Sequence, residues 1–271
     1  MDKIEINLGR VDDYYIKPLY KSLDLIKNKF NFILKISDKE PERGIFLNDK
    51  LVALVDFSDG QRIWRYMNDY PEVFVFKWQY SRDYDYGSRK MISAGYFSPL
   101  MFKQSYLKET KEVDITARMR VNYTREHNIN REKIVDVAKK LKEEGFKTTY
   151  GKIDIDLYLQ ELGTSNIGFN WRGKGCLNFR IIEYIQNEVI MISDELGEKF
   201  PIRDDVILEN NKHYLACSNP EDFYSTSKNI LRDTNRQKEL RNNIKKLWKE
   251  KLCPEKTGEW YYKKIKELEN K

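Results

Sequence analysis

The chain has 271 residues, 40% of them hydrophobic and 13% aromatic, and a formal net charge of +6. This content excludes a disordered chain, and no apolar run approaches the roughly 20 residues that span a bilayer. The N-terminus lacks an apolar signal segment, and three scattered cysteines with two histidines provide neither a disulfide framework nor a zinc-site spacing, so we expect a cytoplasmic protein.

The first half of the chain predicts alternating strands and helices. Apolar runs of strand length predict strands, and apolar residues at helical spacing predict helices. The expected strands are 4–8, 32–36, 51–55 and 73–76, and the expected helices are 12–30 and 61–68. The segment 77–98 is expected to be a long loop with room for a short strand, and long loops in compact domains are often functional.

The second half repeats this alternation. The expected strands are 114–119, 167–170, 189–192 and 213–216, and the expected helices are 130–144, 155–162, 177–186, 220–231, 235–251 and 259–268. Gly145 and Gly163 are expected to end two of these helices. Such alternation implies β-α-β units on mostly parallel sheets, and hence an α/β fold with two halves that meet near residue 110.

The positive charge is concentrated at the C-terminus. Residues 232–271 hold 13 Lys or Arg and 7 Asp or Glu, whereas the first 231 residues hold 36 of each sign. A solvated helical face is the usual explanation of such a stretch. Attraction to an anionic membrane surface or to nucleic acid is the alternative.

The segment 171–183 indicates phosphate chemistry. Gly173 and Gly175 follow an expected strand and precede a helix, where backbone amides approach a ligand closely and the helix dipole favours an anion. Arg172 adds charge at this turn. Arg180 and Glu183 are three residues apart and share a helix face. A tight turn with a surface Arg–Glu pair is the simpler alternative.

The order of these residues resembles the donor-binding half of GT-B glycosyltransferases, and most closely exostosin-like and related short sugar transferases. The resemblance covers about residues 110–262. It is carried by Tyr158, Glu161, Leu162, Ser165 and Ile167, then Arg172, Gly173 and Gly175, then Phe179, Arg180 and Glu183, and by the segments 219–223 and 231–233.

The resemblance implies an α/β fold of two Rossmann-like lobes with parallel sheets and C-terminal helices. Residues 1–110 would form an acceptor-side lobe and residues 111–250 a nucleotide-sugar-binding lobe. Residues 251–271 would form a helix that crosses back to the first lobe.

The resemblance also assigns roles to residues of the second lobe. Arg180 would bind the donor diphosphate and Glu183 the donor ribose. The turn of Gly173 and Gly175, with Arg172, would pass close to the sugar or the phosphates. A basic residue after the first strand of this lobe, Arg118 or its neighbour Arg120, would face the phosphates.

The implied activity is transfer of a hexosyl or pentosyl group from a nucleotide-diphosphate sugar to a hydroxyl of a glycan or glycoconjugate. Retaining members carry a glutamate eight positions before the one that matches Glu183, and this position is Gly175 here, which favours inversion. Arginines and helix amides would neutralise the diphosphate, so no cofactor is obligatory and Mg²⁺ or Mn²⁺ is not favoured.

An inverting reaction needs a general base. Asp59 is the first candidate and Asp56 the second, because both follow an apolar strand of the first half, at the edge where open α/β sheets place ligands. Turn formation before Gly60 is the alternative role of both. His127 is the rival base.

Two further hypotheses concern the 77–98 loop and the basic tail. Asp83 and Asp85 form an Asp-x-Asp pair that suits a divalent metal, although no apolar strand leads directly into it. The aromatic and basic residues of the loop suit an acceptor-sugar platform. The basic tail would permit peripheral membrane contact. A nucleic-acid-associated protein, or a transferase acting on modified DNA bases, is the less favoured alternative function.

Overall fold

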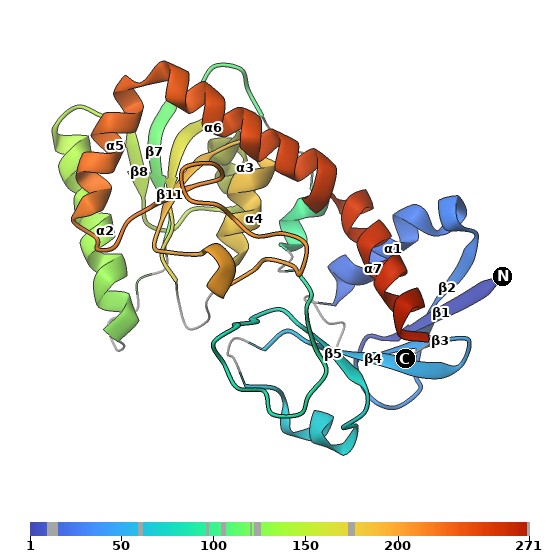
Figure 1. Ribbon diagram of the computed structural model, residues 1–271. Coiled ribbons are helices and arrows are strands. Elements are labelled where there is room, and N and C mark those ends of the chain that lie inside the picture. The colour runs from blue at the N-terminus through green and yellow to red at the C-terminus, as the bar shows by residue number, and fades with distance from the viewer. Residues whose placement is uncertain are drawn as a thin grey trace. The chain divides into compact units, whose positions relative to one another are not determined.

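The computed structural model describes residues 1–9, 16–58, 62–95, 98–103, 107–119, 121, 126–172 and 177–269 (Figure 1). The chain divides into two units. The first comprises Met1–Phe102, Lys199–Ile207 and Lys249–Lys271, and the second comprises Lys103–Glu198 and Leu208–Trp248. Each unit holds helices and a mainly parallel sheet, which confirms the predicted α/β class.

The sheet of the first unit has the order β2-β1-β3-β4-β5-β6. Its strands are β1 (Asp2–Asn7), β2 (Phe32–Ser37), β3 (Gly44–Leu47), β4 (Lys50–Asp56), β5 (Phe74–Lys77) and β6 (Met91–Ser93). The helices of this unit are α1 (Lys17–Phe30) and α7 (Pro254–Glu269), with 3₁₀ turns at Arg65–Asp69 and Pro99–Phe102.

The sequence prediction missed β3, which is antiparallel to β1 and β4 in an otherwise parallel sheet. Its four residues are too few to show a period. The signal was in the turn that follows, because Asn48 and Asp49 both have positive φ. This conformation favours the tight turn of a two-residue β-hairpin.

The sheet of the second unit has the order β11-β10-β9-β7-β8, and all its strand pairs are parallel. The strands are β7 (Val113–Ala117), β8 (Thr148–Tyr150), β9 (Ser165–Phe169), β10 (Ile190–Ser193) and β11 (Leu215–Ala216). The helices are α2 (Glu126–Glu143), α3 (Ile155–Thr164), α4 (Phe179–Gln186), α5 (Asp222–Arg232) and α6 (Thr234–Leu247). Short turns at Gly197–Lys199 and Trp248–Leu252 lie where the chain passes from the second unit to the first.

Of the two glycines predicted to end helices, one does so. Gly145 follows α2 with φ of 93°, the left-handed conformation that ends helices. The prediction for Gly163 was wrong, because α3 continues to Thr164. The short strand β8 was also missed, since a Thr-Thr-Tyr sequence has no apolar run.

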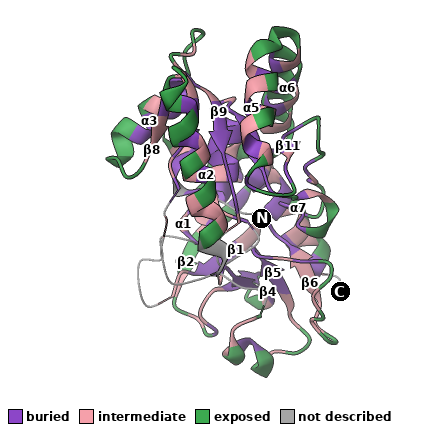
Figure 2. Cartoon of the chain, turned by 90° about the vertical axis from the view of Figure 1, so that its left-hand side faces the viewer, coloured by how far each residue is buried: buried purple, intermediate pink, exposed green. Residues whose placement is uncertain are grey.

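The second sheet is covered on both faces. On one face its apolar side chains form a cluster with those of α2, α5 and α6. On the other face α4 lies so close that a Cβ on Gly168 would meet the Tyr184 ring at 2.4 Å. Tyr184 donates to the carbonyl oxygen of Phe169 at 3.0 Å. The central strands β9 and β10 are therefore almost completely buried, while the outward faces of α2 and α6 are exposed (Figure 2).

Among the helices of the described residues, none combines the length and the apolar character needed to cross a bilayer.

In the first unit α7 packs against α1 at a glycine. A Cβ on Gly258 would lie 2.1 Å from the backbone oxygen of Ser22, so α7 and α1 can approach this closely only because glycine has no Cβ. We expect Gly258→Ala to lower the free energy of unfolding by about 1–3 kcal/mol. In an uncrowded helix the same change would raise it by roughly 1 kcal/mol, so the sign of the effect is diagnostic.

Urea denaturation followed by circular dichroism measures this effect. Lys263→Ala on the exposed face of the same helix is the matched control, with an expected change within about 0.5 kcal/mol. A Gly258→Ala protein as stable as the wild type would contradict the close approach of α7 to α1.

Candidate functional site

The second sheet reverses its strand order between β7 and β9. The chain proceeds from β7 to β8 on one side and from β9 to β10 and β11 on the other. In open parallel sheets, ligands bind at such a switch point, outside the carboxyl ends of the strands. The segments that follow β7 and β9 are therefore where a site is expected.

Arg180 lies at this switch point. From the first turn of α4, its Nη2 donates to the carbonyl oxygen of Arg118 after β7 at 2.9 Å, and its Nη1 lies 3.4 Å from Oδ1 of Asn170 after β9. Its buried Nε has no hydrogen-bond partner among the described residues. A charged donor without an acceptor is costly unless a ligand supplies one.

Arg131 of α2 is a second arginine of this edge, and the sequence prediction missed it. It donates from Nε to the carbonyl oxygen of Arg172 at 3.2 Å and from Nη2 to that of Trp171 at 3.0 Å. Burial, and next the like charge of Arg180, lower the pKa of Arg131 to about 10, against the opposing effect of Asp194. Arg131 thus stays protonated at neutral pH, and the two like charges attract an anion.

Arg172 is held by Asp194, which follows β10. The backbone amide of Arg172 donates to Oδ1 of Asp194 at 3.1 Å, and its Nε forms an ion pair with Oδ2. Burial raises the pKa of Asp194, although the charge and hydrogen bonds of Arg172 act in the opposite direction. Asp194 was not predicted, and only its position directly after a buried strand could have indicated it.

A cavity of about 590 Å³ opens at the same edge, beyond the ends of β9, β10 and β11. Its lining combines a charged pair, amides and hydroxyl or thiol groups with an indole. The lining residues are Asn130, Trp171, Arg172, Asp194, Glu195, Asn210, Ala216, Cys217 and Ser218. Such a mixture can orient a polar ligand through several directed contacts.

Glu183, predicted to bind ribose, is 6% exposed. Its Oε2 accepts a hydrogen bond of 2.8 Å from the hydroxyl of Tyr158 on α3. Burial, and next the charge of Glu183, raise the pKa of Tyr158, so this hydroxyl remains a donor. The contact joins α3 to α4, and ribose binding by Glu183 stays a prediction.

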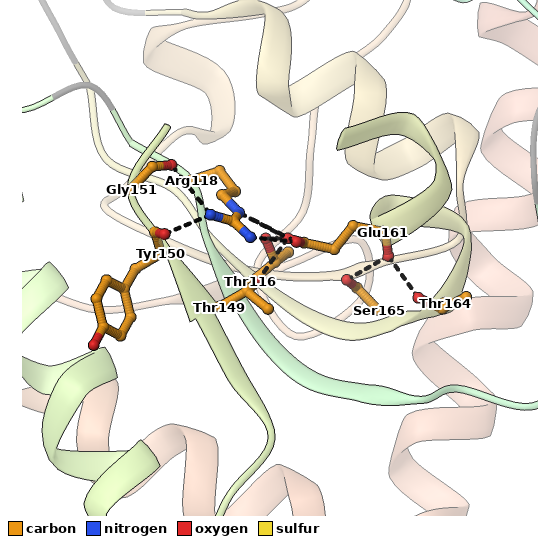
Figure 3. Close-up of polar contacts among 8 residues, drawn as sticks. All are labelled: Thr116, Arg118, Thr149, Tyr150, Gly151, Glu161, Thr164 and Ser165. Atoms are coloured by element: carbon orange, nitrogen blue, oxygen red, sulfur yellow. Dashed lines mark hydrogen bonds and ion pairs between the residues drawn. The ribbon is translucent and has the colours of Figure 1, made fainter. Parts of the chain in front are cut away.

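Arg118, predicted to face phosphates, directs its side chain into the unit (Figure 3). It forms a two-pronged contact with Glu161 of α3, with Nη2 at 2.6 Å from Oε2 and Nε at 3.1 Å from Oε1. The hydroxyls of Thr116 and Thr149 also donate to Oε1, at 2.7 and 2.6 Å. The guanidinium therefore joins the end of β7 to α3. The carbonyl oxygen of Arg118, in contrast, accepts the hydrogen bond from Arg180.

Asp56, a predicted general base, is completely buried in the first unit. Its Oδ2 lies 3.0 Å from the Nζ of Lys77, which is equally buried, and its Oδ1 accepts from the amide of Ser58 at 2.9 Å. The pair joins the ends of β4 and β5. Asp56 would have to leave Lys77 before it could act on an acceptor.

Several predicted residues lie outside the described part of the chain. These are Asp59, Gly173, Gly175, Arg120 and the side chain of His127. Of the Asp-x-Asp pair, Asp83 lies 2.5 Å from Lys199 and Asp85 accepts from the amide of Gly87 at 2.7 Å. No group of three metal-binding side chains occurs among the described residues.

Comparison with known proteins identifies the fold. No family model and no curated protein matches the chain. A solved glycosyltransferase from Rickettsia africae matches it with a TM-score of 0.51 and 13% identity, over 97% of this chain and 84% of the other. The fold is shared with a solved glycosyltransferase.

Two weaker likenesses cover about half of the other chain. TarM matches with a TM-score of 0.49 and 10% identity, over 90% of this chain and 57% of the other. Pneumococcal O-GlcNAc transferase GtfA, solved with UDP and GlcNAc, matches with a TM-score of 0.44 and 12% identity, over 92% and 55%. The Rickettsia likeness confirms the predicted GT-B-like α/β fold, and the exostosin-like subtype stays a prediction.

The Arg118–Glu161 pair gives a stability prediction for the second unit. Burial favours the protonated acid, but hydrogen bonds from Arg118, Thr149 and Thr116 outweigh it and lower the pKa of Glu161. The pair therefore stabilises the fold above the unfolded-state pKa of about 4.3, and this contribution is lost as the pH falls through the lower folded-state pKa. We expect Glu161→Gln to cost about 3–5 kcal/mol at pH 7.

Thermal or urea unfolding between pH 3 and 8 tests this expectation, and the difference from wild type should shrink at the acid end. Glu112→Gln is the control, because Glu112 pairs with Lys108 at 3.0 Å while both side chains are more than half exposed. Its expected cost is below about 1 kcal/mol. A difference independent of pH would contradict the ion-pair assignment.

Proposed function

We propose that this chain is a glycosyltransferase that binds the diphosphate of a nucleotide-sugar donor at the carboxyl edge of the second sheet. The observation that supports it most strongly is the position of Arg180. Its guanidinium lies between the ends of β7 and β9 with Nε unpartnered among the described residues. The fold shared with a solved glycosyltransferase supports the same class of reaction.

Electrostatics favours a diphosphate at this edge. Arg131, Arg172 and Arg180 gather there, and Asp194 is the carboxylate that holds one of them. Positioned arginines can bind phosphate oxygens through paired hydrogen bonds and stabilise the charge that develops on a leaving diphosphate. In this proposal the arginines perform the neutralisation, so a metal is not obligatory.

The rest of the reaction follows from the resemblance. The acceptor is a hydroxyl of a glycan or glycoconjugate, and the transferred group is a hexosyl or pentosyl unit. Inversion is favoured, with a base from the first unit. Asp59 is the first choice, because the alternative, Asp56, is paired with buried Lys77. We place the reaction in the cytoplasm.

The basic C-terminal stretch does not favour a nucleic-acid function. Several of its lysines form ion pairs within the first unit. These are Lys251 with Asp205 at 3.3 Å, Lys264 with Asp204 at 3.0 Å and Lys266 with Asp2 at 3.1 Å. Much of the local positive charge is thus balanced by nearby acids. Peripheral membrane contact through the remaining lysines stays part of the proposal.

Arg180→Ala tests the proposal directly. A hydrogen bond to a charged group contributes roughly 1.5–3 kcal/mol, so we expect the dissociation constant for UDP or GDP to rise by about 10- to 100-fold. Isothermal titration calorimetry measures the constants, and release of sugar from a panel of nucleotide sugars with a pooled acceptor extract measures transfer.

Arg232→Ala is the matched control, because Arg232 is an exposed arginine at the C-terminal end of α5 in the same unit. It should leave nucleotide binding unchanged. Equal affinity of the wild type and the Arg180→Ala variant would refute a diphosphate site at Arg180. Binding without transfer to any acceptor would indicate a nucleotide-sugar-binding protein rather than an enzyme.

A further inference from the structure

Trp171 and Arg172, the second and third residues after β9, are held by contacts with two other elements. Arg131 of α2 donates to the carbonyl oxygens of Trp171 and Arg172. Asp194, after β10, accepts from the backbone amide of Arg172 and pairs with its Nε. The backbone and the side chain of Arg172 are thus both tied to other elements of the unit.

Asp194 is built into the sheet edge. Its side chain is 3% exposed, whereas that of Arg172 is 40% exposed and lines the cavity. The hydroxyl of Ser193 donates to Oδ1 of Asp194 at 3.1 Å, and Ser193 in turn accepts from Asn170 at 2.9 Å. A carboxylate fixed in this way restricts the rotamers of the guanidinium that it holds, and this reduces the entropy lost when the guanidinium binds a ligand.

We infer that Asp194 is a positioning residue that holds Arg172 in place to bind a phosphate group of the nucleotide donor. This inference rests on the proposed function and adds a residue that acts through Arg172. Asp194 itself repels a phosphate, so its benefit to binding has to come from the arginine that it places.

Two opposite effects follow from removal of the Asp194 charge. Loss of a negative charge near the site strengthens the attraction for an anion, whether or not Arg172 is present. Loss of the ion pair frees Arg172 and weakens binding, and this effect requires Arg172. A double-mutant cycle separates the two, because residues in direct contact show a coupling that independent residues do not.

The experiment measures dissociation constants for UDP and GDP with the full chain. The variants are Asp194→Asn, Arg172→Gln and the double variant, with Arg180→Ala as reference. We expect each single change at 194 or 172 to weaken binding by about tenfold. The double variant should bind no more weakly than Arg172→Gln alone.

Ser193→Ala is a milder second test, because it removes one hydroxyl that supports Asp194. It should weaken binding by a smaller factor, and only while Arg172 is present. A general structural defect would instead lower affinity equally in both backgrounds. Unchanged or tighter binding by Asp194→Asn, or an equal loss in the Arg172→Gln background, would overturn the positioning role.

The reference variant separates this inference from the proposed function. If the wild type binds UDP or GDP and Arg180→Ala loses that binding while Asp194→Asn does not, only the role of Asp194 is refuted. If the wild type binds neither nucleotide, the donor site and the role of Asp194 are refuted together.

Discussion

The candidate site depends on the partly buried ion pair between Arg118 and Glu161. The carboxylate of Glu161 on α3 accepts hydrogen bonds from the guanidinium of Arg118 and from the hydroxyls of Thr116 and Thr149. These bonds connect the end of β7 to α3 and β8. The carbonyl oxygen of Arg118 then faces the switch point and accepts from Arg180. The contacts of Arg118 therefore help to fix the position of Arg180, the residue that we propose binds the donor diphosphate. An ion pair that is largely shielded from solvent is costly to break, which suits a fixed point of the scaffold.

Positive charge exceeds negative charge among the residues discussed at this edge. Three arginines converge on the ends of β7, β9 and β10, and Asp194 balances part of their charge. Repulsion among like charges in a partly buried place is unfavourable, and under the proposed function a donor phosphate would relieve that repulsion. The same arrangement explains why hydrogen bonds to backbone carbonyls hold Arg131 and Arg180, since carbonyl oxygens orient a guanidinium without cancelling its charge.

In the first unit, close packing and ion pairing involve features for which the sequence allowed both a structural and a functional explanation. The basic C-terminal helix α7 packs against α1 through Gly258, and its lysines meet acids of the same unit. The carboxylate of Asp56 neutralises Lys77, a residue that is completely buried. Charges that stand out in a sequence are often matched by partners far away along the chain, and a charge count does not show these partners.

The sequence by itself determined the α/β class and most strands and helices, because apolar periodicity is a local signal. It also indicated Arg172 and Arg180 as candidate site residues, through a basic turn after a strand and the resemblance in residue order. The strands β3 and β8 were missed because they are too short to show this periodicity. Only the tertiary structure decided the partners of the site. Arg131 and Asp194 lie 41 and 22 residues from Arg172 along the chain, and Arg118 lies 43 residues from Glu161. Parallel strands bring such distant residues to one edge, and no local pattern records which donor meets which acceptor there.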